Sequence, residues 1–289
     1  MNWKIRCPRC HQLVDFITLS CGGEDCLASE NGVVRLFTDD FYQGFHWYEQ
    51  HFIKARAAEG VRIIDTSVYE QLPFLDNVLG RKEAEWKAFR EDLAIIARHL
   101  AGQQQLRVLN FGSWNGWLSN NLVKWGHQPL AIAYFADKYD GLGAQQFYNN
   151  QWESVQMDIE GSLAIIEDTF DVIILNRGVA FLVDPAKTVG ELMNKLTPGG
   201  QLIITGLNHS RDTTLAARRF QQHRRNYLEK HGFELLFTPT KGYLSLQDIK
   251  RIRELGVQLK PYPNKLLQNI RAQFWKTKPA YAYGYFVNL

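Results

Sequence analysis

The segment of residues 106–123 constrains the fold of this chain more than any other. An apolar run, Leu106–Phe111, leads into the small-residue turn Gly112–Gly116, and apolar residues then recur at helical spacing. This pattern predicts a buried strand, a tight turn and an amphipathic helix. Such a unit directs backbone N–H groups at a ligand, and glycines let the backbone approach that ligand closely. The segment therefore predicts a ligand-binding βα unit.

Strand and helix patterns alternate through the rest of the chain. Strands are predicted at residues 107–111, 129–134, 154–157, 171–175 and 201–206, and helices at 81–100, around 218–230 and from Ser245 onward. Ser245 is a good N-cap, and Asp248 three residues later completes the pattern of a capping box. Two final strands are predicted at residues 232–237 and 281–287. The alternation implies crossover connections, and therefore an α/β fold with a mostly parallel sheet and helices on both faces. Ligands of such sheets bind at the carboxyl ends of the strands.

Three segments resemble motifs of the class I S-adenosylmethionine (SAM) dependent methyltransferases. The first motif of that family is acidic-x-Gly-x-Gly-x-Gly, and Asn110, Gly112, Trp114 and Gly116 stand at its four positions. Residues 170–176 resemble the fourth strand of the family, and residues 196–204 resemble the turn and fifth strand that follow. The chain is also similar, over nearly its whole length, to bacterial methyltransferase-domain proteins with an N-terminal zinc ribbon. The resemblance implies a Rossmann-like sheet.

The resemblance also implies a set of cofactor-binding residues. Residues implied to contact SAM are Asn110, Gly112, Ser113, Gly116 and Asp158, the last standing where the family places the acid that reads the adenine. No catalytic residue is indicated, because SAM carries an already activated methyl group and the enzyme mainly aligns the acceptor. Asn176, at the carboxyl end of the predicted fourth strand, is the candidate that faces the substrate.

Three positions depart from the family pattern, and the first is Asn110, which can accept a hydrogen bond but lacks the charge of the family's acid. Ala133 stands where the family has the acid that accepts hydrogen bonds from the ribose, and a methyl group cannot do so. Asp137 would replace that acid only if its loop bends back. The indole of Trp114 would fill the space for the methionine part of SAM unless the turn directs it outward. We therefore expect an atypical pocket with weak or absent SAM affinity.

All four cysteines lie near the N-terminus, as the two close pairs Cys7 and Cys10, and Cys21 and Cys26. Two such pairs suit tetrahedral zinc ligation, in which each pair supplies two thiolates. Free thiols or two disulfides are the alternatives, and the absence of an export signal argues against disulfides. Four cysteine ligands leave no open position, so the expected zinc is structural.

Three regions are predicted along the 289 residues. They are a zinc ribbon at 1–38, an aromatic-rich connector at 39–80 that packs the ribbon onto the main domain, and a methyltransferase-like domain at 81–289 with an insertion near 240–275. An apolar content of 45% is enough for a sizeable core. No apolar run of about 18 residues and no signal core occur, which predicts a cytoplasmic protein without a membrane span.

Positive charge is concentrated in the C-terminal part of the chain. Residues 205–289 contain 15 Lys and Arg against 5 Asp and Glu, whereas residues 1–204 contain 18 against 25. The densest cluster contributes Arg218, Arg219, Arg224 and Arg225 to one predicted helix. This split favours docking of an acidic protein or a nucleic acid, and a solvated helix face is the alternative.

Three functions remain open at this point. The chain is either a SAM-dependent methyltransferase with an atypical pocket and an unidentified acceptor, or a catalytically inactive methyltransferase fold that serves as a binding or scaffolding subunit. An RNA-binding module that uses the ribbon and the basic tail is a third alternative. SAM binding separates the first two, and salt-dependent RNA binding tests the third.

Overall fold

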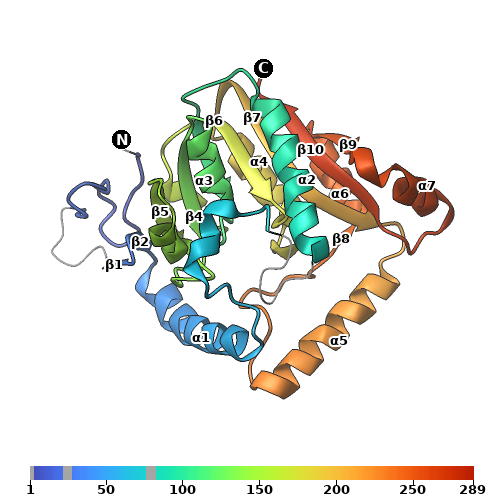
Figure 1. Cartoon of the computed structure of the whole chain (residues 1–289), viewed down its shortest axis with the longest axis horizontal. Coiled ribbons are helices and arrows are strands. Elements are labelled where there is room, and N and C mark those ends of the chain that lie inside the picture. Colours follow the sequence, from blue (N-terminus) through green and yellow to red (C-terminus); the bar gives the residue numbers. More distant parts are fainter. Residues whose placement is uncertain (1–2, 22–27, 76–82) are drawn as a thin grey trace. The chain divides into compact units, whose positions relative to one another are not determined.

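The computed structural model describes residues 3–21, 28–75 and 83–289. The chain forms two compact units, residues 1–172 and 173–289. Each unit contains both strands and helices (Figure 1).

The sheet of the first unit has a parallel core and an antiparallel edge hairpin. Its strands, in spatial order, are β1 (Ala28–Glu30), β2 (Val33–Leu36), β5 (Glu153–Met157), β4 (Gln128–Ala133) and β3 (Arg107–Phe111). The pairs β2 with β5, β5 with β4 and β4 with β3 are parallel, whereas β1 and β2 are antiparallel. Strands β3, β4 and β5 are buried almost throughout, as expected for parallel strands covered on both faces.

Among its described residues the first unit has three α-helices (α) and three 3-10 helices (η). They are α1 (Asp39–Ala58), η1 (Thr66–Gln71), α2 (Glu83–Leu100), α3 (Trp117–Lys124), η2 (Leu142–Phe147) and η3 (Leu163–Ile165). The Thr38 hydroxyl accepts a hydrogen bond from Phe41 N at the start of α1, and two acids occupy its first turn, where they complement the helix dipole. The predicted helix ending at Leu100 is confirmed, with Trp86 and Ile96 fully buried.

The second unit is built around a long antiparallel pair. Its strands, in spatial order, are β6 (Phe170–Asn176, which begins in the first unit), β7 (Leu196–Ser210), β10 (Ala280–Val287) and β9 (Gln258–Pro261), with β8 (Leu244–Ser245) beside β7. Strand β10 pairs antiparallel with both β7 and β9. The predicted strands at 171–175, 201–206 and 281–287 are confirmed.

The helices of the second unit include the two that the sequence predicted, around 218–230 and from Ser245 onward. They are η4 (Val179–Phe181), α4 (Pro185–Met193), α5 (Thr214–His231), α6 (Leu246–Glu254), η5 (Pro263–Lys265) and α7 (Leu266–Phe274). Ser245 forms the predicted capping box with Asp248. The strand predicted at 232–237 is wrong. Gly232 ends α5 in the left-handed conformation and Phe233 packs edge-on against Tyr227, so this segment folds back on its own helix.

Candidate active site

The turn after β3 has the backbone conformation that its glycines predict. Gly112 and Gly116 have φ of 73° and 80°, a left-handed conformation that glycine adopts without steric cost. Gly112 N and Ser113 N donate to Ile132 O at 2.9 and 3.0 Å, which ties the turn to β4. A Cβ at Gly112 would meet nothing within 4 Å, whereas one at Gly116 would lie 2.6 Å from the Trp152 ring. Gly112 therefore borders open space, and Gly116 permits close packing.

Asn110, near the end of β3, connects neighbouring elements through its side-chain hydrogen bonds. Its side chain is buried, and its Nδ2 donates to Ser113 Oγ at 2.8 Å and to Ser119 Oγ at 2.9 Å. The amide thus joins the strand to the turn and to the first part of α3. Asn115, in the same turn, is fully buried and accepts a 3.4 Å hydrogen bond from Trp117 N. These contacts fix the shape of the turn from within.

The indole of Trp114 packs against α2. Its ring lies 6.2 Å from the Phe89 ring at an interplanar angle of 24°, and 6.5 Å from the Trp86 ring. Phe89 also contacts Trp117 at the start of α3. An aromatic cluster therefore holds the indole, although Trp114 adopts a φ of 33° that is uncommon outside glycine.

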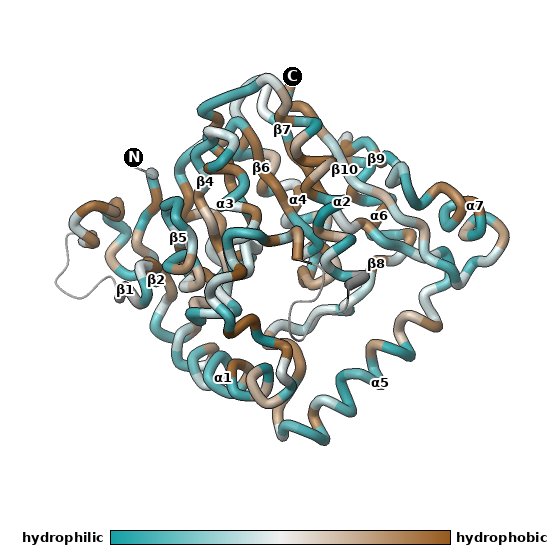
Figure 2. Tube along the Cα trace, in the orientation of Figure 1, coloured by the Kyte–Doolittle hydropathy of each residue, from teal (hydrophilic) through white to brown (hydrophobic). Residues whose placement is uncertain are grey.

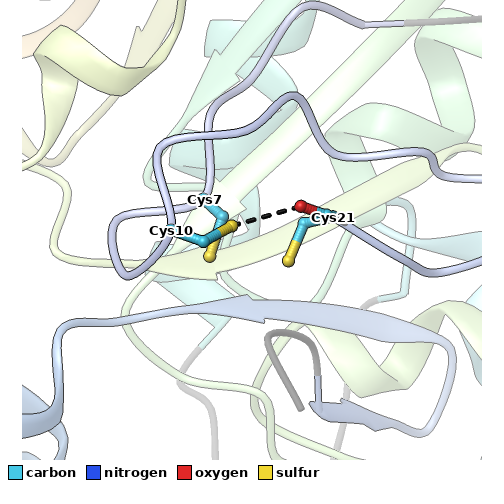
Figure 3. A group of neighbouring side chains, drawn as sticks. All are labelled: Cys7, Cys10 and Cys21. Atoms are coloured by element: carbon cyan, nitrogen blue, oxygen red, sulfur yellow. Dashed lines mark hydrogen bonds between the residues drawn. The ribbon is translucent and has the colours of Figure 1, made fainter. Parts of the chain in front are cut away.

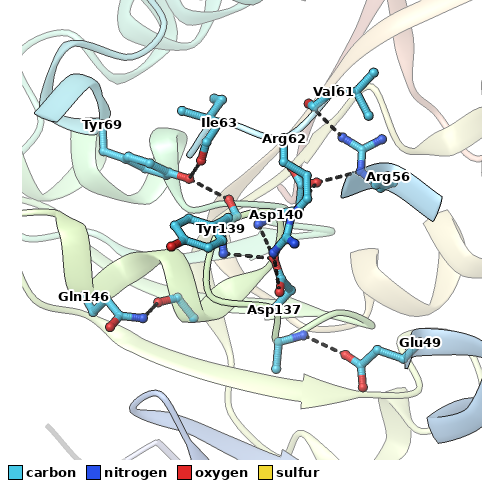
Figure 4. Close-up of polar contacts among 12 residues, drawn as sticks. Glu49, Arg56, Val61, Arg62, Ile63, Tyr69, Asp137, Tyr139, Asp140 and Gln146 are labelled. Carbon is cyan, nitrogen blue, oxygen red and sulfur yellow. Dashed lines mark hydrogen bonds and ion pairs between the residues drawn. The ribbon is translucent and has the colours of Figure 1, made fainter. Parts of the chain in front are cut away.

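The residues after β4 are engaged by the segment that follows α1. Ala133 ends β4 and is buried. The carboxylate of Asp137 lies 2.6 and 2.7 Å from Arg62 Nη2, and its Oδ1 also accepts from Tyr139 N and Asp140 N (Figure 4). The Asp137 carboxylate is therefore engaged by Arg62 and by the backbone of its own loop.

A second ion pair reinforces this connection. Arg56 Nε, near the end of α1, donates to Asp140 Oδ2 at 2.7 Å (Figure 4). Tyr69 lies within the same network and donates its hydroxyl proton to Ile63 O or Tyr139 O, both at 2.8 Å. Burial, with the nearby Asp140 and Asp137 carboxylates, raises the pKa of Tyr69 well above its ordinary value. The tyrosine stays neutral and donates.

Sequence reasoning did not identify Glu49, a buried carboxylate on α1. Its Oε1 accepts from Ala136 N at 3.1 Å and from Gln156 Nε2 at 2.8 Å. Gln156 Nε2 also donates to Tyr134 O. Glu49 thereby joins α1 to the carboxyl ends of β4 and β5. A lone acid among aromatics was the only available signal.

Asp158 lies directly after the carboxyl end of β5, beside the side chain of Tyr134. Its Oδ1 accepts from Tyr134 Oη and from Gly161 N, both at 3.0 Å. Burial and the adjacent Asp158 carboxylate raise the pKa of Tyr134 well above its ordinary value. The Phe41 ring stacks on Tyr134 at 6.2 Å and an angle of 11°. Aromatics of residues 39–80 therefore pack onto the main domain, as predicted.

Three of the four cysteines meet at one point. The Sγ atoms of Cys7, Cys10 and Cys21 lie within 4.8 Å of one another (Figure 3). Cys7 and Cys21 are buried, and Cys7 O accepts from His11 N to close the first turn. Cys26, the fourth predicted ligand, lies outside the described residues. Three converging sulfurs suit the tetrahedral thiolate ligation of zinc.

The cysteine module is attached to the first unit along the chain segment before β6. Ile5 pairs with Ile166 in an antiparallel bridge, and Arg6 N donates to Ile165 O at 2.8 Å. The Trp3 indole stacks on Phe170 with ring centroids 5.6 Å apart. No pattern in the sequence predicted that β2, just after the cysteines, would add a parallel strand to the edge of β5.

Asn176 lies at the carboxyl end of β6 in the second unit. Its Nδ2 donates to Thr205 Oγ1 on β7 at 2.7 Å. Arg177, the next residue, has a φ of 57°, and a Cβ at Gly206 would lie 2.7 Å from its Cγ. Gly206 N donates to Tyr262 Oη at 2.8 Å. These contacts keep the ends of β6 and β7 in register around Asn176.

The basic cluster lies on α5, which is largely hydrophilic along its length (Figure 2). Arg218, Arg219 and Arg225 are exposed, whereas Arg224 forms an ion pair with Glu234 at 2.8 Å. Tyr227 is the buried residue of the helix. A helix that is polar around most of its circumference faces solvent or a polar partner.

The comparisons with known proteins identify the fold. Residues 109–204 match the family model described as a methyltransferase domain. Magnesium protoporphyrin IX methyltransferase (ChlM) of Synechocystis PCC 6803, solved with bound SAH, is similar with a TM-score of 0.50 and 11% identity, over 84% of this chain and 99% of that one. The fold is that of the class I SAM-dependent methyltransferases.

Two further methyltransferases are similar at lower TM-scores. Phosphoethanolamine N-methyltransferase 2 of Haemonchus contortus, in complex with SAM, has a TM-score of 0.46 and 12% identity, with 69% of this chain and 52% of that one covered. N-methyltransferase NodS of Bradyrhizobium japonicum WM9, in complex with SAH, has a TM-score of 0.41 and 15% identity, with coverages of 71% and 87%. No curated protein matches the chain.

The matched part of the methyltransferase fold contains the residues predicted to bind SAM or to face its acceptor. Asn110, Gly112, Gly116, Asp158 and Asn176 all lie within residues 109–204. Among the residues that the structure describes, no helix is long and apolar enough to cross a bilayer.

Proposed function

We propose that this chain is a SAM-dependent methyltransferase with an atypical SAM pocket and an unidentified acceptor. The turn Gly112–Gly116 carries the proposal. It follows a buried strand, it has left-handed backbone at both glycines, and the space beside Gly112 is open. Such a turn lets a ligand approach the main chain, and the α3 N-terminus follows directly.

The residues present fit part of what SAM requires. Backbone at Gly112 and Ser113 would border the cofactor, and Asp158, with one oxygen already bonded to Tyr134, would accept from the adenine amine. Ala133 offers no acceptor for the ribose hydroxyls, which makes the proposed pocket atypical. SAM supplies the methyl group on a sulfonium, so the protein only has to align the acceptor in line with it. Asn176, oriented by Thr205, would face that acceptor.

The second candidate, a catalytically inactive binding subunit, has one observation in its favour. The two acids near the end of β4 are already paired within the chain. Asp137 pairs with Arg62, and Glu49 on α1 accepts from Ala136 N. A ligand would gain no charged partner from them without breaking buried pairs. In that case the methyltransferase fold would serve as a scaffold.

We propose that Cys7, Cys10, Cys21 and Cys26 hold one structural zinc ion in a ribbon at residues 1–38. The convergence of the first three sulfurs supports this assignment. A module of this size has too small a hydrophobic core to fold alone and needs a bound metal ion to stabilise it. Residues 39–80 would then be the connector and 81–289 the methyltransferase-like domain, with the insertion near 240–275 containing α6, β9 and α7.

The exposed arginines of α5 support a docking face for an acidic protein or a nucleic acid. Exchange of Arg218 and Arg225 for Glu should weaken partner binding most at low salt, because exposed charges are screened as salt rises. The free energy of unfolding should change little. A marked loss of stability with unchanged partner binding would show instead that these arginines serve the fold.

A crystal structure determined with SAM tests the proposed function. We expect the methionine part to lie along Gly112–Gly116 and the adenine to lie beside Asp158. A map with no electron density for SAM at this turn, from crystals grown at saturating SAM, would favour the inactive binding subunit. SAM bound elsewhere would reject the assignment of the turn.

A further inference from the structure

Helix α7 is attached to the second unit through a polar face. Asn269 pairs with the backbone of Tyr281 on β10, donating from Nδ2 to Tyr281 O at 3.0 Å and accepting from Tyr281 N at 2.7 Å. Arg211 Nη2 donates to Ala272 O at 2.8 Å and also to Gln273 O. Ala272 is the buried residue of the helix. Hydrogen bonds, with one small apolar side chain, hold α7 in place.

The opposite face of α7 is apolar and exposed. Its residues and their exposed fractions are Leu266 60%, Leu267 70%, Ile270 43%, Phe274 74% and, just beyond the helix, Trp275 57%. At 100° per residue, 267, 270 and 274 fall on one side of the helix and 269 and 272 on the other. The apolar face of α7 is thus the exposed one, the reverse of the usual amphipathic arrangement. Five exposed large apolar side chains along one short segment form a patch that marks an interaction site.

Positive charge predominates around this patch, although the Asp212 carboxylate lies near Lys276. Residues 255–289 contain five cations, Lys260, Lys265, Arg271, Lys276 and Lys278, and no Asp or Glu. Arg271, Lys276 and Lys278 are exposed around α7. A cavity of about 470 Å³ lies along the inner side of the helix, and Arg211, Lys260 and Lys278 contribute to its lining together with neutral residues. The local field therefore attracts an anionic surface.

We propose that α7 docks on the surface of an anionic phospholipid bilayer. Leu267, Ile270 and Phe274 would enter the boundary between headgroups and acyl chains, with Trp275 at headgroup level. Arg271, Lys276 and Lys278 would contact lipid phosphates. An apolar stripe flanked by cations, with Trp and Phe among its members, is the pattern of helices that lie in the membrane interface. A protein partner would explain the apolar stripe but not the excess of cations over acids in residues 255–289, so the charge pattern favours the bilayer.

Vesicle co-sedimentation of the full chain tests this proposal. Vesicles of phosphatidylcholine alone are compared with vesicles of equal parts of phosphatidylcholine and phosphatidylserine. We expect binding to the anionic vesicles that decreases with salt, and little binding to the neutral ones. The paired substitution Leu267→Ser with Phe274→Ser should weaken binding about tenfold or more, because it removes apolar area that enters the interface. The matched control Trp47→Ser removes a side chain on α1 that is 54% exposed and should leave binding unchanged.

A charge series completes the test. Lys276→Gln with Lys278→Gln should weaken binding to anionic vesicles about fivefold per residue, whereas Arg218→Gln with Arg219→Gln on α5 should have little effect. Equal losses from both pairs would show non-specific attraction and overturn the proposal. The proposal would also be overturned if the wild-type protein did not bind the vesicles and the α7 variants differed from it in molecular mass in solution. In that case α7 would be a contact between copies of the chain. Unchanged SAM binding in the α7 variants would separate this proposal from the proposed function.

Discussion

The Nη2 nitrogen of Arg62 lies 2.6 and 2.7 Å from the two carboxylate oxygens of Asp137. Both side chains are mostly buried, with 13% and 10% exposed. The pair joins the segment after α1 to the loop after β4, and it engages Asp137, the acid that the sequence offered as a replacement for the missing ribose contact at Ala133.

Breaking this pair should strongly destabilise the first unit. Arg62→Gln is expected to lower the free energy of unfolding by about 3 kcal/mol, because it leaves the Asp137 carboxylate buried without its charged partner. The double variant with Asp137→Asn should recover part of that loss, as measured by urea denaturation. A loss in the double variant equal to the sum of the losses in the two single variants would mean that the two side chains act independently.

The cysteine cluster should bind metal. Elemental analysis of purified protein is expected to give about one zinc per chain, and Cys10→Ser should lower that value and loosen the ribbon. The parallel sheet, followed by far-ultraviolet circular dichroism, should survive the substitution. Protein that contains no zinc and four reactive thiols would reject the metal site.

The two glycines of the turn after β3 should differ in their tolerance of alanine. Both substitutions force alanine into left-handed backbone, at about 1 kcal/mol. Gly116→Ala also drives a Cβ into the Trp152 ring, so a total destabilisation of about 3 kcal/mol is expected. Gly112→Ala, which meets no atom, is the matched control. Equal losses in denaturant unfolding would contradict the packing role of Gly116.

The capping box of α6 should make stability depend on acid pH. Burial alone would raise the pKa of Asp248, but hydrogen bonds from the Lys241 ammonium and from the Ser245 hydroxyl and N–H outweigh it and lower that pKa below 3.8. A lowered folded-state pKa contributes stability that is present above the unfolded value and lost as pH falls through the folded value. Asp248→Asn should therefore cost about 1 kcal/mol at neutral pH and progressively less below pH 3.8. A cost that does not change with pH would show that the carboxylate charge is not involved.

The local elements were predictable from the sequence because short-range signals specify them. The strand before Gly112, the helix ending at Leu100 and the capping box at Ser245 each depend on neighbouring residues alone. The strand expected at 232–237 failed because a short apolar run does not show whether it pairs with a sheet or packs on the preceding helix. Phe233 of this run packs against Tyr227 on the preceding helix.

The polar network of the candidate site was not predictable, because its partners are far apart in the chain. Glu49 and Gln156 are separated by 107 positions, and Arg62 and Asp137 by 75. No local pattern marks a glutamate on an aromatic helix as the partner of a glutamine on a distant strand. The direction of the Trp114 side chain likewise depends on Phe89, which belongs to another helix. The cysteines were predictable, since their spacing is itself the signal.

Calorimetric titration of the purified chain with SAM tests the central claim, a SAM pocket that lacks its ribose acceptor. We expect binding weaker than micromolar, and about tenfold or more tightening in Ala133→Asp, because a charged acceptor contributes roughly 1.5–3 kcal/mol. Ala133→Asn, with a neutral acceptor, should fall between the two, and circular dichroism confirms that each variant is folded. Submicromolar binding by the unaltered chain, or folded Ala133→Asp that binds no more tightly, would contradict the account.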